Sequence, residues 1–272
     1  MITADLHTHT RYSHGKNTVR DMFEAGRERG IALHGFSEHS PRPEGYDYPR
    51  EYREQLVRAY PDYVRDVLAL KERYPCQVLL GMEVDWLEAE AGFIRTAIRA
   101  YDFDYLIGSV HFVGTWGFDF SADDWKDFSP EQCAAHYESY FRTLTGMAAS
   151  RLFNIAAHPD LIKIFSIETF RQWLTRHDGL DLVRESLVAV RDAGMSMEIS
   201  SAGLRKPCKE IYPGPEIMRL AADLRVPVVF GSDAHQSAEM GFAFDELARY
   251  ATAFGIKGGE CLIGGVGFAF PL

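Results

Sequence analysis

Histidine and carboxylate side chains recur in this sequence beside short apolar segments, and these are residue types that bind transition metals. The densest cluster is DLHTHTRYSHG at residues 5–15, where His7 and His9 stand two apart and His14 follows five residues later. Side chains two apart on a strand point to the same side, so His7 and His9 can face one ion together. An H-x-H pair also occurs in ordinary polar loops, and the rest of the chain must separate the two interpretations.

Other histidines and carboxylates repeat this placement along the chain. The segments SEHS, GME, SVH, AAHPD and GSDAH each follow or end an apolar run, and they contribute His39, Glu83, His111, His158, Asp233 and His235. Imidazole and carboxylate bind Zn, Mn and Fe, and one carboxylate can bridge two ions. Nine candidate ligands are too many for one ion and suit three, so the pattern predicts a metal cluster. The remaining histidines, His34, His136 and His177, are expected to be structural or solvated.

Seven apolar segments are the predicted strands that would position these ligands, and amphipathic segments between them are predicted helices. The strands are 2–6, 31–37, 76–82, 103–110, 152–157, 195–200 and 226–232, with a further apolar stretch at 261–269. The helices are 18–29, 50–73, 88–100, 130–149, 181–193, 214–223 and 244–253, and Pro61 is expected to kink or split the second.

This alternation predicts an α/β fold, a parallel barrel shorter than the eight-stranded one. An open doubly wound sheet is the alternative, but no glycine-rich phosphate loop follows the first strand. The carboxyl ends of the strands of a parallel barrel converge on one face, so the nine candidate ligands are expected to meet there.

Length and composition favour a single domain over residues 1–272, with 46% hydrophobic residues to build a core. A bilayer-spanning run and a signal peptide are not evident, which predicts a cytoplasmic protein. The net charge of −10 argues against a nucleic-acid partner, but bound cations would still let a small anionic substrate bind. The separated cysteines, Cys76, Cys133, Cys208 and Cys261, are expected to be reduced and mostly buried. Nothing in the sequence indicates the oligomeric state.

The motifs DLHTHT, SEHS, GMEVD, GSVHF, AAHPDL and GSDAH resemble, in this order, those of the PHP (polymerase and histidinol phosphatase) family. They run from the first predicted strand to the seventh. GMEVDW, SVHFV followed by WGFDF, and HPDLIK are most similar to its histidinol-phosphate phosphatase branch.

The resemblance implies a distorted (β/α)7 barrel, TIM-barrel-like, that holds three divalent ions, whether Zn, Mn or Fe. It divides the ligands into three sets: His7, His9, Glu83 and Asp233 for the first ion; Glu83, His111 and His158 for the second; His14, His39 and His235 for the third. Asp5, which precedes the H-x-H pair, is expected to orient a ligand imidazole.

The implied reaction belongs to histidine biosynthesis: L-histidinol phosphate plus water gives L-histidinol and phosphate. A metal-bridging hydroxide would attack phosphorus in line. Asp233, or a water at the third ion, would supply a proton to the leaving oxygen, and Glu83 and His235 complete the expected catalytic group.

Basic residues are expected to complete a phosphate pocket, and we predict Arg205 and Lys163, with Lys206 as a weaker candidate. Solvated loop cations are the alternative for these positions. Histidinol carries an amine and an imidazole, which an acidic group and aromatic faces would suit. For these contacts we predict Trp116, Phe118 and Asp119, with Asp85 and Tyr46 as weaker candidates.

Three other functions are compatible with part of this pattern. A family member that acts on another phosphomonoester, a nucleotide or an oligonucleotide would share all the metal ligands. An amidohydrolase also begins with H-x-H, but it bridges its metals with a modified lysine, and the predicted strands contain none. A metal-storage or regulatory barrel would bind ions without turnover.

Overall fold

The computed structural model describes the backbone of all 272 residues and every side chain except that of residue 177. Its main sheet has seven parallel strands in the order β1-β2-β3-β4-β7-β8-β9. Their bounds are Ala4–Asp5 (β1), Leu33–Phe36 (β2), Val78–Asp85 (β3), Tyr105–Ser109 (β4), Ile155–Ala156 (β7), Ser196–Ser200 (β8) and Val228–Gly231 (β9).

The two edge strands of this sheet come together, so the sheet curls into a barrel. The Leu6 amide donates to the Phe230 carbonyl at 3.3 Å, and Thr8 forms an isolated parallel bridge with Ala234. Because only these few bonds join β1 to β9, closure is incomplete. The distorted seven-stranded barrel expected from the sequence is therefore confirmed, and the open doubly wound alternative is wrong.

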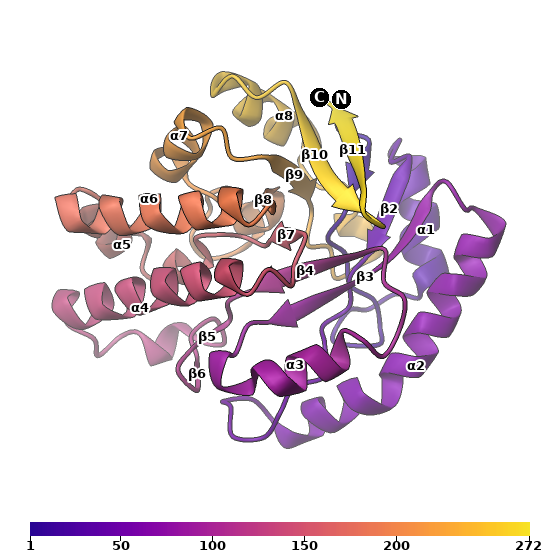
Figure 1. Cartoon of the computed structure of the whole chain (residues 1–272), viewed down its shortest axis with the longest axis horizontal. Helices are drawn as coiled ribbons and strands as arrows, with labels where there is room; N and C mark the ends of the chain where they lie inside the picture. Colours follow the sequence, from indigo (N-terminus) through magenta and orange to yellow (C-terminus); the bar gives the residue numbers. More distant parts are fainter.

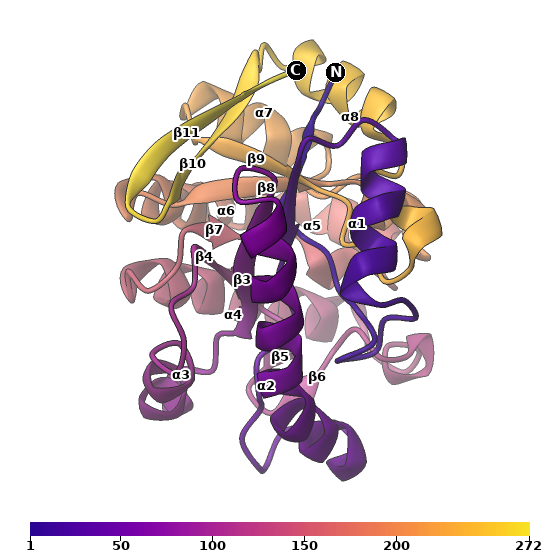
Figure 2. The same ribbon diagram turned by 90° about the vertical axis from the view of Figure 1, so that its right-hand side faces the viewer.

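Eight helices surround the barrel (Figures 1 and 2). Their bounds are Val19–Glu28 (α1), Arg50–Arg73 (α2), Ala91–Ala97 (α3), Pro130–Ala149 (α4), Ile167–Leu174 (α5), His177–Asp192 (α6), Pro215–Asp223 (α7) and Phe244–Ala253 (α8). In α1 the buried residues Val19, Met22, Phe23 and Gly26 recur at helical spacing, and Thr18 caps the first turn.

Three helix predictions need correction. The helix α5 was not expected, and α6 begins at residue 177 rather than 181. Helix α2 is not split, because it continues through Pro61 as one element. Proline removes one hydrogen bond to the carbonyl four residues earlier, that of Val57, and both residues are exposed, so water can satisfy that carbonyl.

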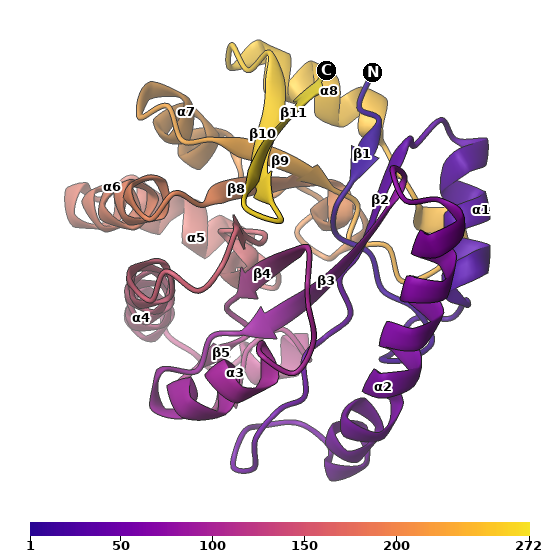
Figure 3. The ribbon, with the colours of Figure 1, turned by 45° about the vertical axis from the view of Figure 1, so that its right-hand side comes forward.

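An antiparallel hairpin, β10 (Gly258–Ile263) and β11 (Val266–Pro271), closes the amino-terminal end of the barrel (Figure 3). Its Cys261, Ile263 and Phe270 join the buried interior cluster formed by the strands. The Gly264 amide donates to the Asp104 carbonyl, just before β4, at 2.7 Å. The apolar stretch 261–269 thus contains a reversal of the chain at two glycines with positive φ.

The opposite, carboxyl-terminal end carries a small hairpin made of β5 (Phe112–Val113) and β6 (Trp116–Gly117). All four cysteines are free; Cys76 is exposed and the other three are buried. Among the helices of the described structure, none combines the length and apolar character that crossing a bilayer requires.

Candidate metal centre

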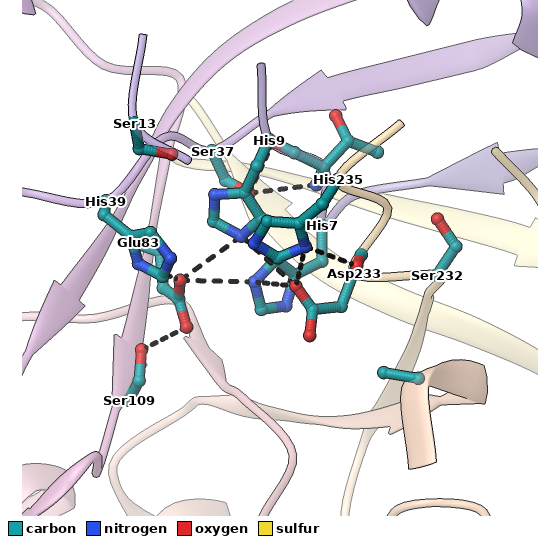
Figure 4. A network of polar contacts seen from close by, with 12 residues as sticks. His7, His9, Ser13, Ser37, His39, Glu83, Ser109, Ser232, Asp233 and His235 are labelled. Atoms are coloured by element: carbon teal, nitrogen blue, oxygen red, sulfur yellow. Dashed lines mark hydrogen bonds and ion pairs between the residues drawn. The ribbon is translucent and has the colours of Figure 1, made fainter. Parts of the chain in front are cut away.

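The nine side chains predicted as ligands gather at the carboxyl-terminal end of the barrel. His7 and His9 follow β1, His39 follows β2, and Glu83 lies within β3, which extends to Asp85. His111, His158, Asp233 and His235 follow β4, β7 and β9 in the same way, and His14 belongs to the loop after β1. Figure 4 shows His7, His9, His39 and His235 converging on Glu83 and Asp233. Strand order, not sequence proximity, therefore assembles the cluster.

Three compact groups within the cluster have the geometry that a metal ion requires. In each group, ligand atoms lie within 4.8 Å of one another, and the groups are His7, His9 and Asp233; His7, Glu83 and His158; and His9, His39 and His235. Adjacent groups share His7 or His9. A chain of neighbouring ions is the arrangement that such shared ligands suit.

Glu83 lies at the centre of the cluster and is 2% exposed. Its Oε2 is 2.7 Å from His39 Nδ1 and 3.4 Å from His9 Nε2, and its Oε1 is 3.2 Å from His158 Nε2. The Ser109 hydroxyl donates to the same Oε1 at 2.7 Å. The two carboxylate oxygens thus face different imidazoles, which is the placement that a bridging ligand needs.

His14 is placed differently from the other eight side chains. It is exposed and belongs to none of the three compact groups. Its ring centroid is nevertheless 4.2 Å from that of His235 and 4.9 Å from that of His39, and its Nδ1 lies 3.0 Å from the Tyr52 hydroxyl. The ring therefore stands at the rim of the cluster, held from outside by α2.

Buried polar atoms without a partner test whether metal fits this site. Within the described part of the chain, four imidazole nitrogens of cluster residues make no hydrogen bond: His7 Nε2, His9 Nε2, His158 Nδ1 and His235 Nε2. An unpaired buried polar group costs about 1–3 kcal/mol. Several such costs in one small volume are explained when cations supply the missing partners, so the residues fit a metal centre.

The carboxylates of the cluster are strongly anionic. Burial alone would raise the pKa of Glu83, but the electrostatic influence of His39, His7 and His111 holds that pKa well below its usual range. Burial would likewise raise the pKa of Asp233, and its imidazole neighbours hold it well below 3.8. Fixed negative charge in a buried site attracts cations.

The imidazoles divide into two classes. Burial would lower the pKa of His9, but Asp233, Glu38 and Glu83 raise it to about 9, and the same balance with Asp85 and Glu83 raises the pKa of His111 to about 9. For His235, burial lowers the pKa to about 4. In the metal-free protein some rings therefore carry protons that metal binding must displace, which couples metal affinity to pH.

Three further carboxylates orient ligand rings, and the sequence analysis did not identify them in this role. Glu198 Oε1 lies 2.9 Å from His7 Nδ1, Glu38 Oε1 lies 3.2 Å from His9 Nδ1, and Asp85 Oδ1 accepts from His111 Nδ1. A carboxylate that holds Nδ1 turns Nε2 toward the metal. A detectable hint existed for Glu198, because it interrupts the otherwise apolar and small segment MSMEIS.

Asp5 has another role than the one expected. Its carboxylate accepts from the Ser232 amide at 2.9 Å, from the Ser232 hydroxyl at 2.6 Å and from the Gly241 amide at 3.1 Å. These bonds hold the segment that carries Asp233. Asp5 therefore positions a backbone segment, and the carboxylates described above orient the imidazoles.

The backbone is strained at two cluster residues. His158 has φ of 21° and Asp233 has φ of 49°, values that L-residues other than glycine rarely adopt. The His158 amide donates to Glu198 Oε2 at 2.8 Å, which helps to hold this conformation. Backbone strain of this kind concentrates at functional sites.

Two predicted phosphate contacts have different outcomes. Arg205 reaches the segment around Asp233, where its Nη2 donates to the Ser232 and Asp233 carbonyls at 2.8 and 2.9 Å. Its Nη1 has no hydrogen-bond partner among the described residues. The prediction for Lys163 is wrong, because its buried Nζ donates to Asp160, Glu210 and the Ile211 carbonyl and has no donor left for a substrate.

The residues predicted to contact the histidinol part of the substrate also have different outcomes. Phe118 is fully buried and packs against Tyr140, so the prediction that it binds substrate is wrong. Trp116 is half-buried in an aromatic cluster with Trp125, Phe128 and His136. Asp119 is partly exposed and is among the groups whose negative charge raises the pKa of His111.

Comparison with known proteins gives concordant results. A family model described as "PHP domain" matches residues 5–202. A "Probable histidinol-phosphatase" of Deinococcus radiodurans is 34% identical over 251 residues, which cover 90% of this chain and 91% of that protein.

Two solved structures have the same fold. HisK of Listeria monocytogenes has a TM-score of 0.79 at 24% identity, covering 89% of this chain and 99% of that one. Histidinol phosphate phosphatase of Lactococcus lactis, determined in complex with Zn, L-histidinol and phosphate, has a TM-score of 0.76 at 16% identity, covering 98% of both chains.

Proposed function

The chain belongs to the PHP domain family, and from this premise we propose that it is a metal-dependent phosphatase that hydrolyses L-histidinol phosphate to L-histidinol and phosphate. The reaction would serve histidine biosynthesis in the cytoplasm. The supporting relatives are similar over nine-tenths of the chain and bear the name histidinol-phosphatase. The structure of the Lactococcus lactis protein with Zn, L-histidinol and phosphate supports the same choice of substrate.

The observation that carries this proposal is the arrangement around Glu83. One buried carboxylate with both oxygens turned toward imidazoles belongs to one of the compact ligand groups and contacts His39 of another. Uncatalysed phosphate monoester hydrolysis is among the slowest reactions in biology, and clustered charge is the main means of accelerating it. A site of this kind is built for that purpose.

We assign the ligands to three divalent ions. His7, His9, Glu83 and Asp233 would hold the first, Glu83, His111 and His158 the second, and His14, His39 and His235 the third. When bound, such ions acidify a water, hold the phosphoryl oxygens and offset charge on the leaving oxygen. The donor set of imidazole and carboxylate suits Zn, Mn and Fe alike.

The chain's own residues would complete the reaction around these ions. Arg205 presents an unpartnered Nη1 beside Asp233 and would bind a phosphoryl oxygen. Asp233, which is ionised and has a side chain 12% exposed, would accept the proton that the attacking water loses and pass it to the leaving alkoxide. The Asp119 carboxylate would form an ion pair with the protonated amine of histidinol. His235 would support Asp233, since its Nδ1 lies 3.0 Å from the Asp233 carbonyl.

An amidohydrolase activity is not supported by this structure. That chemistry bridges its metals with a lysine from a barrel strand, and none of the described barrel strands contains a lysine. Lys163, a buried lysine that follows β7, forms ion pairs with two carboxylates, those of Asp160 and Glu210. Glu83 would take the bridging position instead.

A substrate panel tests the proposal. Purified protein loaded with Mn²⁺ or Zn²⁺ is assayed for phosphate release from L-histidinol phosphate, a nucleoside monophosphate, p-nitrophenyl phosphate and a short oligonucleotide. We expect the highest kcat/KM for L-histidinol phosphate and loss of all activity after chelation. Preferential cleavage of the oligonucleotide would contradict the substrate assignment, and metal binding without any turnover would contradict the enzymatic one.

A further inference from the structure

Arg42, in the loop after β2, is a buried cation at the edge of the metal cluster. It is 6% exposed, although arginine is among the residues least often buried. Its Nε donates to Asp85 Oδ2. Its guanidinium carbon lies 5.5 Å from the ring centroids of Tyr48 and Tyr52 and 5.6 Å from that of Phe112. A carboxylate and three aromatic faces therefore hold this side chain in one place.

Two of these partners each touch one of the proposed ligands. The second oxygen of Asp85 accepts from His111 Nδ1, and the Tyr52 hydroxyl lies 3.0 Å from His14 Nδ1. Arg42 is thus one residue removed from two imidazoles that follow different strands. Glu38 and Glu198 contact the rings of His9 and His7 directly. The rings of His111 and His14 are held by Asp85 and Tyr52 instead.

We propose that Arg42 is a positioning residue that sets the orientation of two outer ligand rings, His111 through Asp85 and His14 through Tyr52. The inference rests on the proposed function in that both rings hold metal. The ion pair keeps one Asp85 oxygen on the guanidinium and leaves the other for His111 Nδ1, so that His111 Nε2 stays 3.6 Å from Glu83 Oε1. The planar contact with Tyr52 fixes the hydroxyl that meets His14.

This geometry requires arginine rather than any cation. A guanidinium offers a flat face to the rings and a directed Nε–H to the carboxylate at the same time. Lysine would retain the charge beside Asp85 but would lose the planar contacts. Arg42 would therefore link the second and third ions of the centre, whose ligands otherwise come from separate loops.

The variants separate this role from general stability. Arg42→Met keeps most of the apolar stem, Arg42→Lys keeps the charge, and Tyr52→Phe removes only the hydroxyl that meets His14. The matched control is Arg53→Met, because Arg53 pairs with Glu44, whose side chain is 80% exposed, and touches no proposed ligand. Thermal unfolding of each metal-free variant monitors the fold.

Metal binding is the main measurement, because it needs no substrate. Metal-free protein is titrated with Mn²⁺ by calorimetry, and bound ions are counted by elemental analysis. We expect Arg42→Met to weaken two binding steps by about 10–100-fold, the usual effect of removing a residue behind a ligand. Tyr52→Phe is expected to weaken one step, Arg42→Lys to give an intermediate loss and Arg53→Met to match the wild type. For L-histidinol phosphate at saturating metal, kcat is expected to fall in Arg42→Met while KM stays nearly constant.

Several outcomes would overturn the inference. If Arg42→Met binds Mn²⁺ like the wild type and only its KM rises, Arg42 contacts substrate and does not position the rings. If Arg42→Met does not fold, Tyr52→Phe decides: wild-type titration of that variant refutes the inference, and selective loss of one binding step upholds it. Wild-type protein that binds no metal would refute the proposed function itself, whatever the variants do.

Discussion

The two ends of the barrel are built from the same seven strands and differ in almost every chemical respect. At the amino-terminal end, Leu79 and Ile155 pack against Ile263 and Phe270 of the hairpin in an interior that is mainly apolar. At the carboxyl-terminal end, buried histidines and carboxylates converge, and several of their polar atoms lack a protein partner. A single strand such as β3 changes from leucine to glutamate within a few residues.

This contrast indicates that one end of the barrel contributes mainly to stability and the other mainly to reactivity. Burial of apolar side chains stabilises a fold by roughly 25 cal/mol for each Å² removed from water. Burial of unpaired polar groups opposes folding. The hairpin end is therefore expected to govern unfolding, and the histidine end is expected to govern metal binding and hydrolysis. Substitutions at each end can test that division.

The largest effect is expected for Glu83→Gln at the histidine end. The amide keeps the shape but loses the charge and the second metal-binding oxygen, so we expect kcat to fall by about 10³-fold or more, on the scale of losing a principal electrostatic group. Elemental analysis should show at least one ion fewer than in the wild type. His136→Gln, in a half-buried histidine outside the cluster, is the control. Retained turnover in Glu83→Gln would contradict the central role of this carboxylate.

At the hairpin end, Ile263→Ala is expected to lower the free energy of unfolding by about 2–5 kcal/mol, because the side chain is 4% exposed within the barrel interior. Chemical denaturation of the metal-free protein measures this change. The control is Leu262→Ala, since Leu262 is 46% exposed on the outer face of the same strand and should change stability by less than about 0.5 kcal/mol.

The same variant also tests whether the two ends of the barrel act independently. Below its unfolding temperature, the folded Ile263→Ala protein should have the kcat of the wild type. A large loss of kcat in a folded Ile263→Ala protein would show that the ends are energetically coupled. The comparison would then need to be abandoned.

A smaller effect is expected for Glu198→Gln. The amide can still accept from His7 Nδ1–H but lacks the charge that favours this orientation, so we expect metal affinity to fall by about 10–100-fold. Isothermal titration with Mn²⁺ measures the loss. Glu216→Gln, in the first turn of α7 and exposed, is a matched control. Equal Mn²⁺ affinities in Glu198→Gln and Glu216→Gln would show that Glu198 does not orient His7 for metal binding.

The smallest effect concerns His34, a buried histidine away from the cluster. It packs against Phe23 and Gly26, its two ring nitrogens lack partners among the described residues, and burial lowers its pKa to about 4. In the unfolded chain His34 has a pKa near 6.5, so below this pH it binds a proton that it does not bind in the folded chain. Stability is therefore lost as pH falls from about 6.5 toward 4, by about 1 kcal/mol at pH 5.5.

The difference between wild-type and His34→Leu protein isolates this contribution. Denaturation midpoints of the metal-free proteins are compared between pH 7.5 and pH 5, and the wild type should lose more stability on acidification. Parallel curves would mean that His34 titrates normally. Among the described residues, His34 belongs to none of the compact ligand groups, so a buried unpaired imidazole does not by itself make a metal site.

Much of the fold was predictable because it depends on local patterns. The seven strands and most helices follow from apolar periodicity and from caps such as Thr18, which need no knowledge of distant residues. Helix α5 was missed because its segment is short. The reversal at Gly264 was missed because 261–269 consists of apolar residues and glycines, and only packing on the end of the barrel gives the residues of β10 their alternating burial.

The side chains that gather at the carboxyl-terminal end were also predictable, because parallel strands present their carboxyl ends on one face. Their partners were not. Lys163 and Arg205 are both cations after neighbouring strands, yet Asp160 and Glu210 bind the first, while the second remains with a free donor. Asp160 stands three residues before Lys163 and is a local hint, but Glu210 reaches Lys163 only through the fold.

The sequence by itself therefore determined the family, the order of the elements and the residue types delivered to the carboxyl-terminal end of the barrel. Those properties are local, since they depend on spacing along one strand or helix. Only the tertiary structure decided which carboxylate holds which imidazole, as with Glu198 and His7 or Asp85 and His111. Such pairings join residues far apart in the chain, and packing of the whole barrel sets their distances.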